Sequence, residues 1–563
     1  MKETFILDKS AYRGALMIKL RFVLLGVVAG LVIGSPTLAV VPTEITFRSD
    51  VLHRGSPRQA GLLPAPIESL PDIAASYLVP AADHPDHPAY AGAAVLAARH
   101  GVVVSRFAVG DAVRYSGATT ELPVDQRIPA RVDTLWDLAS ISKLFTTIVV
   151  LQQAEAGHVD LDQPVRSYLP EFSAAAVTVR HLLTHTSGLP PFLPFFSRYP
   201  TPETRLHAML TTPVLAGTTP GRQYAYSDIG LIALGVLAER VAGKPLAGLV
   251  HAGITGPLRM RDTGYRPTAV ERTAATEFQP YAGRGMVRGE VHDENAWSIG
   301  GVAGHAGVFS TVDDLAILCQ TLLNGGIYRG ERILSARTIR QALVNYNADL
   351  LAQYPESSRG LGFELAKHSY MDGMTSPVTF GHTGFTGTSV VIDPLDQSFL
   401  ILLSNRVHPD RAWGTNTVAR RALARAFAAA RPVQAPPGGG EVWRSDLRDA
   451  TTMTLTVSGG PGSFQLWYDT QPGIDTLTVE TSADGTAWTP VGLSLRSGYE
   501  RVTSDGVFSG FGGRRWWTAT PAVPPGPALR FTYRTDAAAQ GRGVLVAGIG
   551  HVDTADGWTR QPS

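Results

Sequence analysis

The sequence predicts an α+β domain followed by an all-β sandwich, and three observations lead to this class. Strand-like apolar segments occur early, at residues 90–110, and again late, at residues 388–404. Helical patterns dominate between residues 140 and about 250. Beyond residue 440 the helical period disappears, and short strands alternate with turn residues. Strands at both ends of a domain, with helices between them, are expected to share one antiparallel sheet.

Each element of the first domain has its own signal. Residues 90–110 predict two strands around a turn at residues 99–101. Residues 388–393 and 398–404 predict a second pair, joined by a turn that begins with proline, "PLDQ". The segment "NTVARRALARAFAAA" then predicts a helix that ends near Arg431. We therefore place the first domain at residues 89–431.

The change in composition at "RPVQAPPGGG" predicts a linker at residues 432–440 and a β-sandwich at residues 441–563. The sandwich is rich in large aromatic residues, which either fill its core or lie exposed and bind glycan or cell wall; the core is the favoured interpretation. These residues are Trp467, Tyr468, Trp488, Trp516 and Trp517.

The N-terminus predicts an export signal over residues 1–39, with Met17 as an alternative start. Lys19 and Arg21 precede an apolar run at residues 22–34, and "TLA" ends at Ala39. The run is short for a membrane span, which favours a cleaved signal. The alternative is an uncleaved N-terminal anchor, and the protein would contact a membrane only in that case. In both cases the protein acts outside the cytoplasm. Residues 40–88 form a polar, proline-bearing N-terminal extension.

Charge and cysteine content exclude several classes of protein. The chain has 49 basic and 48 acidic residues, a net charge of +1, which predicts no nucleic-acid partner. Cys319 is the single cysteine, so no intramolecular disulfide can form, and its apolar surroundings predict a buried side chain.

Ser140 and Lys143 stand three residues apart at the predicted start of a helix, in "WDLASISKLFTT". Residues at i and i+3 share a helix face, so the hydroxyl and the amine should meet. A lysine whose pKa is lowered by burial can take the proton of a serine nucleophile. The alternative from these residues alone is an N-cap serine and a solvated lysine.

Two further segments suggest polar groups near this serine. Tyr226 precedes an apolar helix, where its hydroxyl could shuttle protons; Ser227 or Asp228 would serve as the N-cap in the structural alternative. The segment "FGHTGFTG" places His382 and Thr383 among glycines at a strand edge, which lets another backbone approach closely. The alternative there is a tight turn with a solvated histidine. We interpret His185, in "HLLTHTSGLP", as structural.

Ser-x-x-Lys, Tyr-Ser-Asp and His-Thr-Gly, in this order and with "HLLTHTSGLP" between the first two, resemble the serine β-lactamase and penicillin-binding protein superfamily. The most similar branch is the class C-like one, and residues 289–316 resemble its penicillin-binding-protein-4-like subgroup. The resemblance spans about residues 90–430. It implies a β-lactamase/transpeptidase-like fold, in which an antiparallel sheet flanked by helices adjoins a helical lobe, with the site between them.

The resemblance also implies roles for individual residues. Ser140 would be the acylated nucleophile, Lys143 its base, and Tyr226 a proton relay with a pKa lowered by Lys143. The backbone N–H groups of Ser140 and Phe385 would form the oxyanion hole. The substrate would meet Asp228, His382, Thr383, Gly384 and Phe385.

Two positions depart from the family pattern. Asp228 stands where many relatives have asparagine, and it could pair with Lys143, hold it charged and move the base role towards Tyr226. His382 stands where β-lactamases usually have lysine, and it would hold a substrate carboxylate less firmly. Both changes lower the expected turnover of β-lactams.

No metal and no cofactor are expected. His292, Asp293, Glu294 and His305 fit no compact set of metal ligands, and the family uses none. His305 is expected only as a residue of the pocket wall.

The resemblance predicts a serine hydrolase that acts on small amides or esters. Peptides ending in D-alanine, as for a D,D-carboxypeptidase, are the preferred substrates. An esterase or D-aminopeptidase-like hydrolase is the alternative, followed by a β-lactamase and by a catalytically silent surface-binding protein. The last segment resembles jelly-roll modules appended to secreted bacterial hydrolases, such as immune-inhibitor-A-like peptidases.

Overall fold

The computed structural model describes residues 42–81, 85–522 and 526–561. The export signal predicted for residues 1–39 lies outside this range. Within the described residues, no helix combines the length and the apolar character that crossing a membrane requires.

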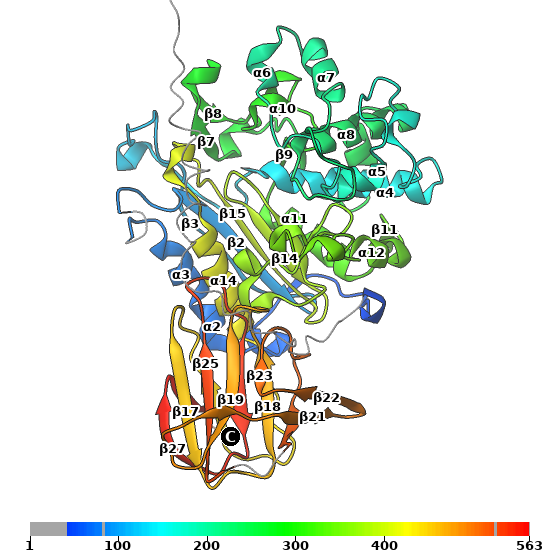
Figure 1. The fold of residues 1–563 in the computed structure, drawn as a ribbon. Coiled ribbons are helices and arrows are strands. Elements are labelled where there is room, and N and C mark those ends of the chain that lie inside the picture. The colour runs from blue at the N-terminus through cyan, green and yellow to red at the C-terminus, as the bar shows by residue number, and fades with distance from the viewer. Residues whose placement is uncertain (1–41, 82–84, 523–525, 562–563) are drawn as a thin grey trace, which may run out of the picture. The chain divides into compact units, whose positions relative to one another are not determined.

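A central sheet forms the middle layer of the first domain (Figure 1). The early and late strand pairs meet in it, because β2 and β15 pair antiparallel. This confirms the predicted α+β class. In spatial order the strands are β1 (His53–Arg54), β3 (Val102–Val113), β2 (Gly92–Arg99), β15 (Ser398–Ser404), β14 (Ser389–Asp393), β13 (Phe380–Thr383) and β12 (Glu364–Leu365), and β4 (Ile128–Pro129) pairs with β3.

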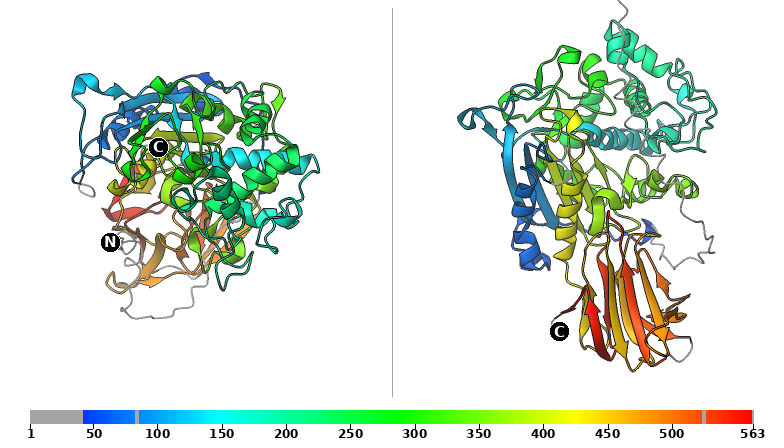
Figure 2. Two further views of the ribbon diagram at one scale, coloured as in Figure 1. Left: turned by 90° about the horizontal axis from the view of Figure 1, so that it is seen from above. Right: turned by 60° about the vertical axis from the view of Figure 1, so that its left-hand side comes forward.

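Helices cover both faces of this sheet, so its strands are apolar on both sides. In β15, Phe399, Ile401 and Leu403 face one core, while Leu400 and Leu402 face the other. The first face is covered by α11 (Val312–Leu323), and the same core continues to α4 (Ser142–Glu155) and α8 (Asp228–Ala242), which pack against each other. The second is covered by α2 (Pro64–Glu68), α3 (Leu70–Ser76) and α14 (Thr417–Ala429), as the side view in Figure 2 shows. The N-terminal extension therefore completes this second layer.

The helical lobe carries α8, which begins and ends where the sequence indicates. The Ser227 hydroxyl accepts a hydrogen bond from the Gly230 N–H, and Gly243 ends the helix with φ +63°. The other α-helices of the described residues are α5 (Val179–Leu183), α6 (Phe195–Arg198), α7 (Pro202–Leu210), α9 (Leu246–Val250), α10 (Glu294–Ser298), α12 (Ala336–Ala342) and α13 (His368–Met371), of which α13 packs against α14. Short strands join them: β5 (Trp136–Asp137), β9 (Val308–Ser310) and β6 (Gly264–Tyr265) form one sheet, β7 (Ala275–Phe278) and β8 (Met286–Arg288) a second, and β10 (Ile327–Tyr328) and β11 (Glu331–Arg332) a third.

The C-terminal region consists of two sheets that enclose a separate apolar core, which confirms the predicted sandwich. One sheet runs β22 (Glu500–Ser504), β21 (Leu493–Ser497), β24 (Trp517–Pro521), β18 (Phe464–Asp469), β26 (Gly543–Ala547), β16 (Val442–Ser445) and β28 (Trp558–Gln561). The other runs β20 (Thr489–Pro490), β19 (Thr476–Ser482), β25 (Ala528–Arg534), β17 (Thr452–Ser458) and β27 (His551–Asp556), with β23 (Val507–Phe508) paired to β19.

Most of the aromatic residues singled out in the sandwich are buried. Trp467, Tyr468, Trp516 and Trp517 are all less than 9% exposed. Trp488 is partly exposed and lies against the Arg530 guanidinium. Tyr468 and Trp517 belong to the core between the two sheets, whereas Trp467 and Trp516 form a separate apolar cluster outside it. The interpretation that most of these aromatic residues fill the sandwich core is therefore confirmed only in part.

Candidate functional site

The nucleophile candidate Ser140 lies in a strained turn between β5 and α4. Ala139, directly before it, has φ +47°, a backbone conformation that residues other than glycine rarely adopt. The turn is held by Asp137, whose Oδ1 accepts a hydrogen bond from the Ala139 N–H at 2.8 Å. Oδ2 of the same carboxylate accepts one from the His292 N–H at 2.6 Å. The turn brings Ser140 to the wall of a cavity.

Lys143 lies one turn further along and contacts Ser140, as the spacing predicts. Its Nζ donates to Ser140 Oγ at 2.8 Å and to the carbonyl oxygen of His305 at 3.1 Å. It also lies 2.8 Å from Oδ1 of Asp228, at the N-terminus of α8. The lysine is only 1% exposed, so these three groups, together with Tyr226, form its polar surroundings.

The protonation states at this site differ from those expected. Burial alone lowers the pKa of Lys143, but the Asp228 carboxylate and Tyr226 outweigh it, so the pKa lies above its usual value. Burial raises the pKa of Tyr226 by more than Lys143 lowers it. The expected lowering of both pKa values is therefore wrong, whereas the expected Asp228–Lys143 pair is confirmed. The resting site holds a charged lysine and a neutral tyrosine.

Replacing Asp228 with asparagine is expected to shift the acidic limb of the kcat/KM profile to lower pH. Lys143 must lose a proton to act as a base, so activity rises as pH approaches its pKa. The asparagine keeps the shape but removes the charge that raises this pKa. The measurement is a pH profile of hydrolysis between about pH 6 and 10. The control is Asp293→Asn, which removes the carboxylate paired with His305. If the acidic limb of the kcat/KM profile stays at the same pH in Asp228→Asn, Lys143 is not the base.

Tyr226 is held by His185 and by two cations. The His185 ring stacks on the tyrosine with 4.4 Å between ring centroids, and its Nδ1 accepts a hydrogen bond from the Ser227 N–H at 3.0 Å. The Lys143 Nζ lies 4.9 Å from the tyrosine ring centroid, and the guanidinium of Arg359 lies 5.2 Å from it. The contacts of His185 agree with a structural role, which is to hold Tyr226 beside Lys143.

The loop after β13 is tied directly to the nucleophile turn. The Thr386 hydroxyl donates to the Asp137 carbonyl at 2.8 Å, and the Thr388 hydroxyl donates to the Leu138 carbonyl at 3.0 Å. At Gly384 a Cβ atom would lie 2.1 Å from Thr388 Oγ1 and 2.5 Å from the Leu138 oxygen, so glycine is required there. These contacts fix the distance between Ser140 and Phe385, the two residues whose N–H groups the resemblance assigns to the oxyanion hole.

His382 lines the cavity as a neutral side chain. Burial lowers its pKa to about 4. Its Nδ1 donates to the Thr383 carbonyl at 2.7 Å, and its Nε2 lies 3.4 Å from Nη1 of Arg359. Arg359 also forms a buried ion pair with Glu364 at 2.8 Å. A guanidinium from a distant loop therefore lies beside the position where relatives have lysine, and no spacing in the sequence indicated it.

The cavity at Ser140 has a volume of about 490 Å³ and an excess of basic residues. Thr383, Gly384 and Phe385 line it as predicted, whereas Asp228 and His305 are not among its lining residues. His305 is buried, and it contacts Lys143 through its carbonyl, which corrects the expected pocket-wall position. The charged residues of the wall are Arg359, Lys367, Arg406 and Arg420, with Glu356 and Glu364 as the acids.

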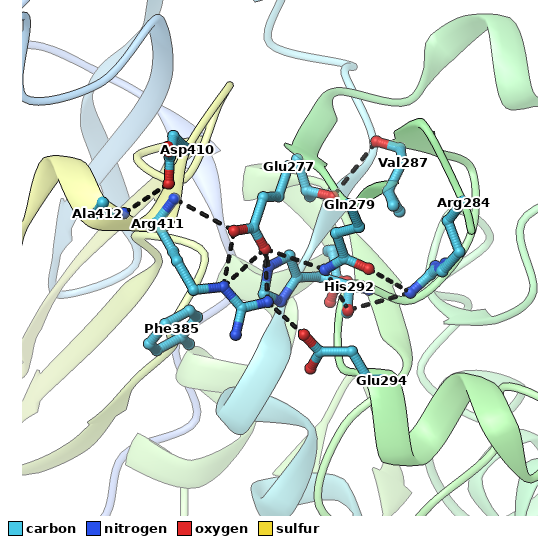
Figure 3. Close-up of polar contacts among 12 residues, drawn as sticks. Glu277, Gln279, Arg284, Val287, His292, Glu294, Phe385, Asp410, Arg411 and Ala412 are labelled. Atoms are coloured by element: carbon cyan, nitrogen blue, oxygen red, sulfur yellow. Dashed lines mark hydrogen bonds and ion pairs between the residues drawn. The ribbon is translucent and has the colours of Figure 1, made fainter. Parts of the chain in front are cut away.

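An ion-pair network braces the side of the site next to Phe385 (Figure 3). Glu277 is buried and receives hydrogen bonds from His292 Nε2 at 2.7 Å and Arg411 Nη2 at 2.6 Å. Burial alone raises the pKa of Glu277, but these two partners hold it well below its usual range. The Arg411 guanidinium also pairs with Glu294 and lies 5.6 Å from the ring centroid of Phe385. No motif or spacing in the sequence indicated this network.

Asp228, Asp293 and His305 bring one donor atom each within 4.8 Å of one another. The Lys143 ammonium, 2.8 Å from Asp228, and the His305–Asp293 contact at 2.8 Å already use these groups. The expectation of no metal stays a prediction. Dialysis against EDTA is therefore expected to leave hydrolysis unchanged, measured with and without added Zn²⁺; a loss that Zn²⁺ restores would contradict it.

Comparisons with known proteins agree with this geometry. The family model described as Beta-lactamase matches residues 81–425. A protein of Escherichia coli (strain K12) named "Putative D-alanyl-D-alanine carboxypeptidase" is 31% identical over 346 residues, which are 54% of this chain and 76% of that protein. A protein with the same name from Salmonella agona (strain SL483) is 32% identical over 345 residues, with the same two shares.

Among solved structures, "EstCE1, a hydrolase with promiscuous acyltransferase activity" has a TM-score of 0.51 and 23% identity. The match covers 65% of this chain and 98% of that one. At this identity the likeness concerns the fold alone.

Proposed function

Because the chain belongs to the Beta-lactamase family of serine hydrolases, we propose that it is an exported hydrolase that forms an acyl-enzyme on Ser140, with peptides ending in D-alanine as substrates. The observation that carries the proposal is the 2.8 Å contact between Ser140 Oγ and Lys143 Nζ, with Tyr226 beside the lysine and a cavity beside the serine.

The chemistry follows from the positions of these groups. Ser140 Oγ attacks the substrate carbonyl and gives its proton to Lys143 once the lysine is neutral. The oxyanion is bound by the N–H groups of Ser140 and Phe385. Lys143, through Tyr226, returns the proton to the leaving amine, and an acyl ester remains on the serine. Water then attacks this ester and passes a proton to the same pair of side chains, which gives a proton to Ser140 Oγ as the acid is released.

The charge of the cavity supports a substrate with a free carboxylate. Arg359, Lys367 and Arg420 line its wall, and guanidinium groups bind carboxylates with paired hydrogen bonds. The names of the two relatives from Escherichia coli and Salmonella agona point to the same class of peptide. In this chain the arginines would supply the charge that the neutral His382 lacks.

The test uses the full chain and three peptides that end in D-Ala-D-Ala, in D-Ala-L-Ala, or in an amidated D-Ala-D-Ala. Release of D-alanine from the first peptide alone supports the proposal, because the third lacks the carboxylate. Incubation with a penicillin, followed by intact mass, should give a slowly lost adduct. Rapid penicillin turnover would instead indicate a β-lactamase. Absence of peptide cleavage, adduct and ester hydrolysis would indicate a catalytically silent binding protein.

An esterase is the second candidate, and the neutral His382 favours it. With a pKa of about 4 this histidine offers no charge at pH 7 for an anionic leaving group. A panel of short-chain p-nitrophenyl esters distinguishes the two candidates. Efficient ester cleavage without peptide cleavage would replace the peptidase proposal with an esterase.

A further inference from the structure

A second cavity, of about 520 Å³, lies between residues 431–437 and the sandwich. It shares no lining residue with the cavity at Ser140. Its wall is basic and aromatic, formed by Arg99, Arg431, Arg514, Arg515, Arg542 and two tryptophans, Trp467 and Trp516. The predicted linker therefore packs as one wall of a basic cavity.

Four of the five arginines in this wall have carboxylate partners. Arg99 and Arg431 both pair with Asp396, at 3.3 and 2.5 Å. Arg514 pairs with Asp393 at 2.5 Å and with Asp469 at 3.3 Å. Arg515 pairs with Glu500 on the surface. The structural role of these four arginines is accounted for by their ion pairs.

Arg542 is the exception among the described residues, since no carboxylate lies within ion-pair distance of it. It is 4% exposed, and its Nη2 donates to the Arg431 carbonyl at 2.6 Å. Its Nε is buried without a hydrogen-bond partner. Burial, together with the charges of Arg514 and Arg431, lowers the pKa of Arg542 to about 9, and the carboxylates of Asp396 and Asp469 oppose this shift only in part. An unpaired buried cation is costly to stability, and an anion in the cavity would remove that cost.

The two tryptophans give the cavity flat apolar surfaces beside this cation. The Arg542 guanidinium lies 5.3 Å from the Trp467 ring centroid. Trp516 is 8% exposed, and its Nε1 donates to the Gln434 carbonyl at 2.7 Å, which fixes the plane of its ring. A fixed aromatic face next to a guanidinium can bind a ligand whose ring has an apolar face, which packs on the tryptophan, and a carboxylate, which pairs with the guanidinium.

We propose that this cavity binds a carboxylate-bearing sugar, with the acid on Arg542 and the sugar ring against Trp516. The site is independent of the reaction at Ser140. It also differs from the exposed-aromatic surface considered from the sequence, because the aromatic residues involved here are buried in the wall of a cavity. The partly exposed side chains of Arg431 and Arg515 leave its rim open to solvent.

The experiment is a ligand-observed NMR titration of the full chain carrying Ser140→Ala, which prevents turnover. The probes are N-acetylmuramic acid and N-acetylglucosamine, which differ by the lactyl carboxylate, and inorganic sulfate. We expect N-acetylmuramic acid alone to bind, and Arg542→Gln to weaken it by about tenfold or more. Arg560→Gln, at an exposed ion pair elsewhere on the sandwich, is the matched control.

Each other result would overturn part or all of the proposal. Equal binding of both sugars would remove the role of the carboxylate, and binding of sulfate alone would leave a simple anion site. If neither sugar binds, the cavity has no such ligand. Should Arg542→Gln fail to fold, Trp516→Phe tests the same site, since loss of half the aromatic face is expected to weaken N-acetylmuramic acid as well.

Discussion

Ser140→Ala is expected to abolish the penicillin adduct and to lower kcat by at least about 10³-fold. The Ser140 hydroxyl is the group that Lys143 contacts at 2.8 Å, and the strained turn at Ala139 holds it at the cavity wall. Without this oxygen no acyl-enzyme can form, so the residual rate reflects binding and the oxyanion donors alone. The measurements are intact mass after incubation with a penicillin or a fluorophosphonate, and the steady-state rate on the best substrate.

Ser142→Ala is the matched control for this prediction. Ser142 lies two residues away and is fully buried, whereas Ser140 is partly exposed; the Ser142 hydroxyl accepts a hydrogen bond from the Val308 N–H at 3.0 Å. This variant should form the adduct like the parent protein and lose only modest stability. If the adduct persists in Ser140→Ala and disappears in Ser142→Ala, the nucleophile is Ser142 and the prediction is wrong.

Arg514→Met is expected to destabilise the protein by about 3–5 kcal/mol, the largest stability effect that we predict. The arginine is buried and joins Asp393, at the end of β14, to Asp469, at the end of β18 in the sandwich. The change removes one guanidinium and leaves two buried carboxylates without their main partner. The measurement is urea unfolding, followed by tryptophan fluorescence and by loss of activity.

The deficit should be larger at about pH 8 than at about pH 5. Burial already raises the pKa of Asp469 to about 6 despite Arg514, and removing the cation raises it further. When the pKa of a carboxyl group is raised in the folded state, the free energy of unfolding of the protein decreases as pH rises. This decrease is larger in the variant than in the parent protein, because the pKa of Asp469 is raised further. Arg515→Met, which breaks an exposed pair with Glu500, is the control and should cost about 1 kcal/mol or less. A similar loss of stability in Arg514→Met and Arg515→Met would contradict the stabilising role of the buried ion pairs that Arg514 forms with Asp393 and Asp469.

The sequence was most informative where one local rule decides the outcome. The spacing of Ser140 and Lys143 placed both on one side of a helix start, and the structure brings their side chains to 2.8 Å. The two strand pairs, the cap of α8 and the change of pattern after residue 440 follow equally local signals. The glycine at position 384 is a similar case, because a close approach of two backbones leaves no room for a Cβ.

Other parts of the site come from segments that no spacing links. Arg359, His382 and Tyr226 lie in three different segments, and the packing of the lobe against the sheet brings them together. The Glu277 network likewise joins residues more than one hundred positions apart. Sequence reasoning has no rule for such contacts, because they depend on the final positions of whole elements.

The sequence by itself determined the fold class and the contact between Ser140 and Lys143, because these depend on helical and strand periods within a few residues. Only the tertiary structure decided the protonation states of Lys143 and Tyr226, the cation beside His382, and the arginine cavity next to the sandwich. The physical reason is that charge interactions depend on burial and on distances through space. Asp228 shows the difference: its position in the sequence suggested a partner, and its 2.8 Å distance from Lys143 decided which charge that lysine carries.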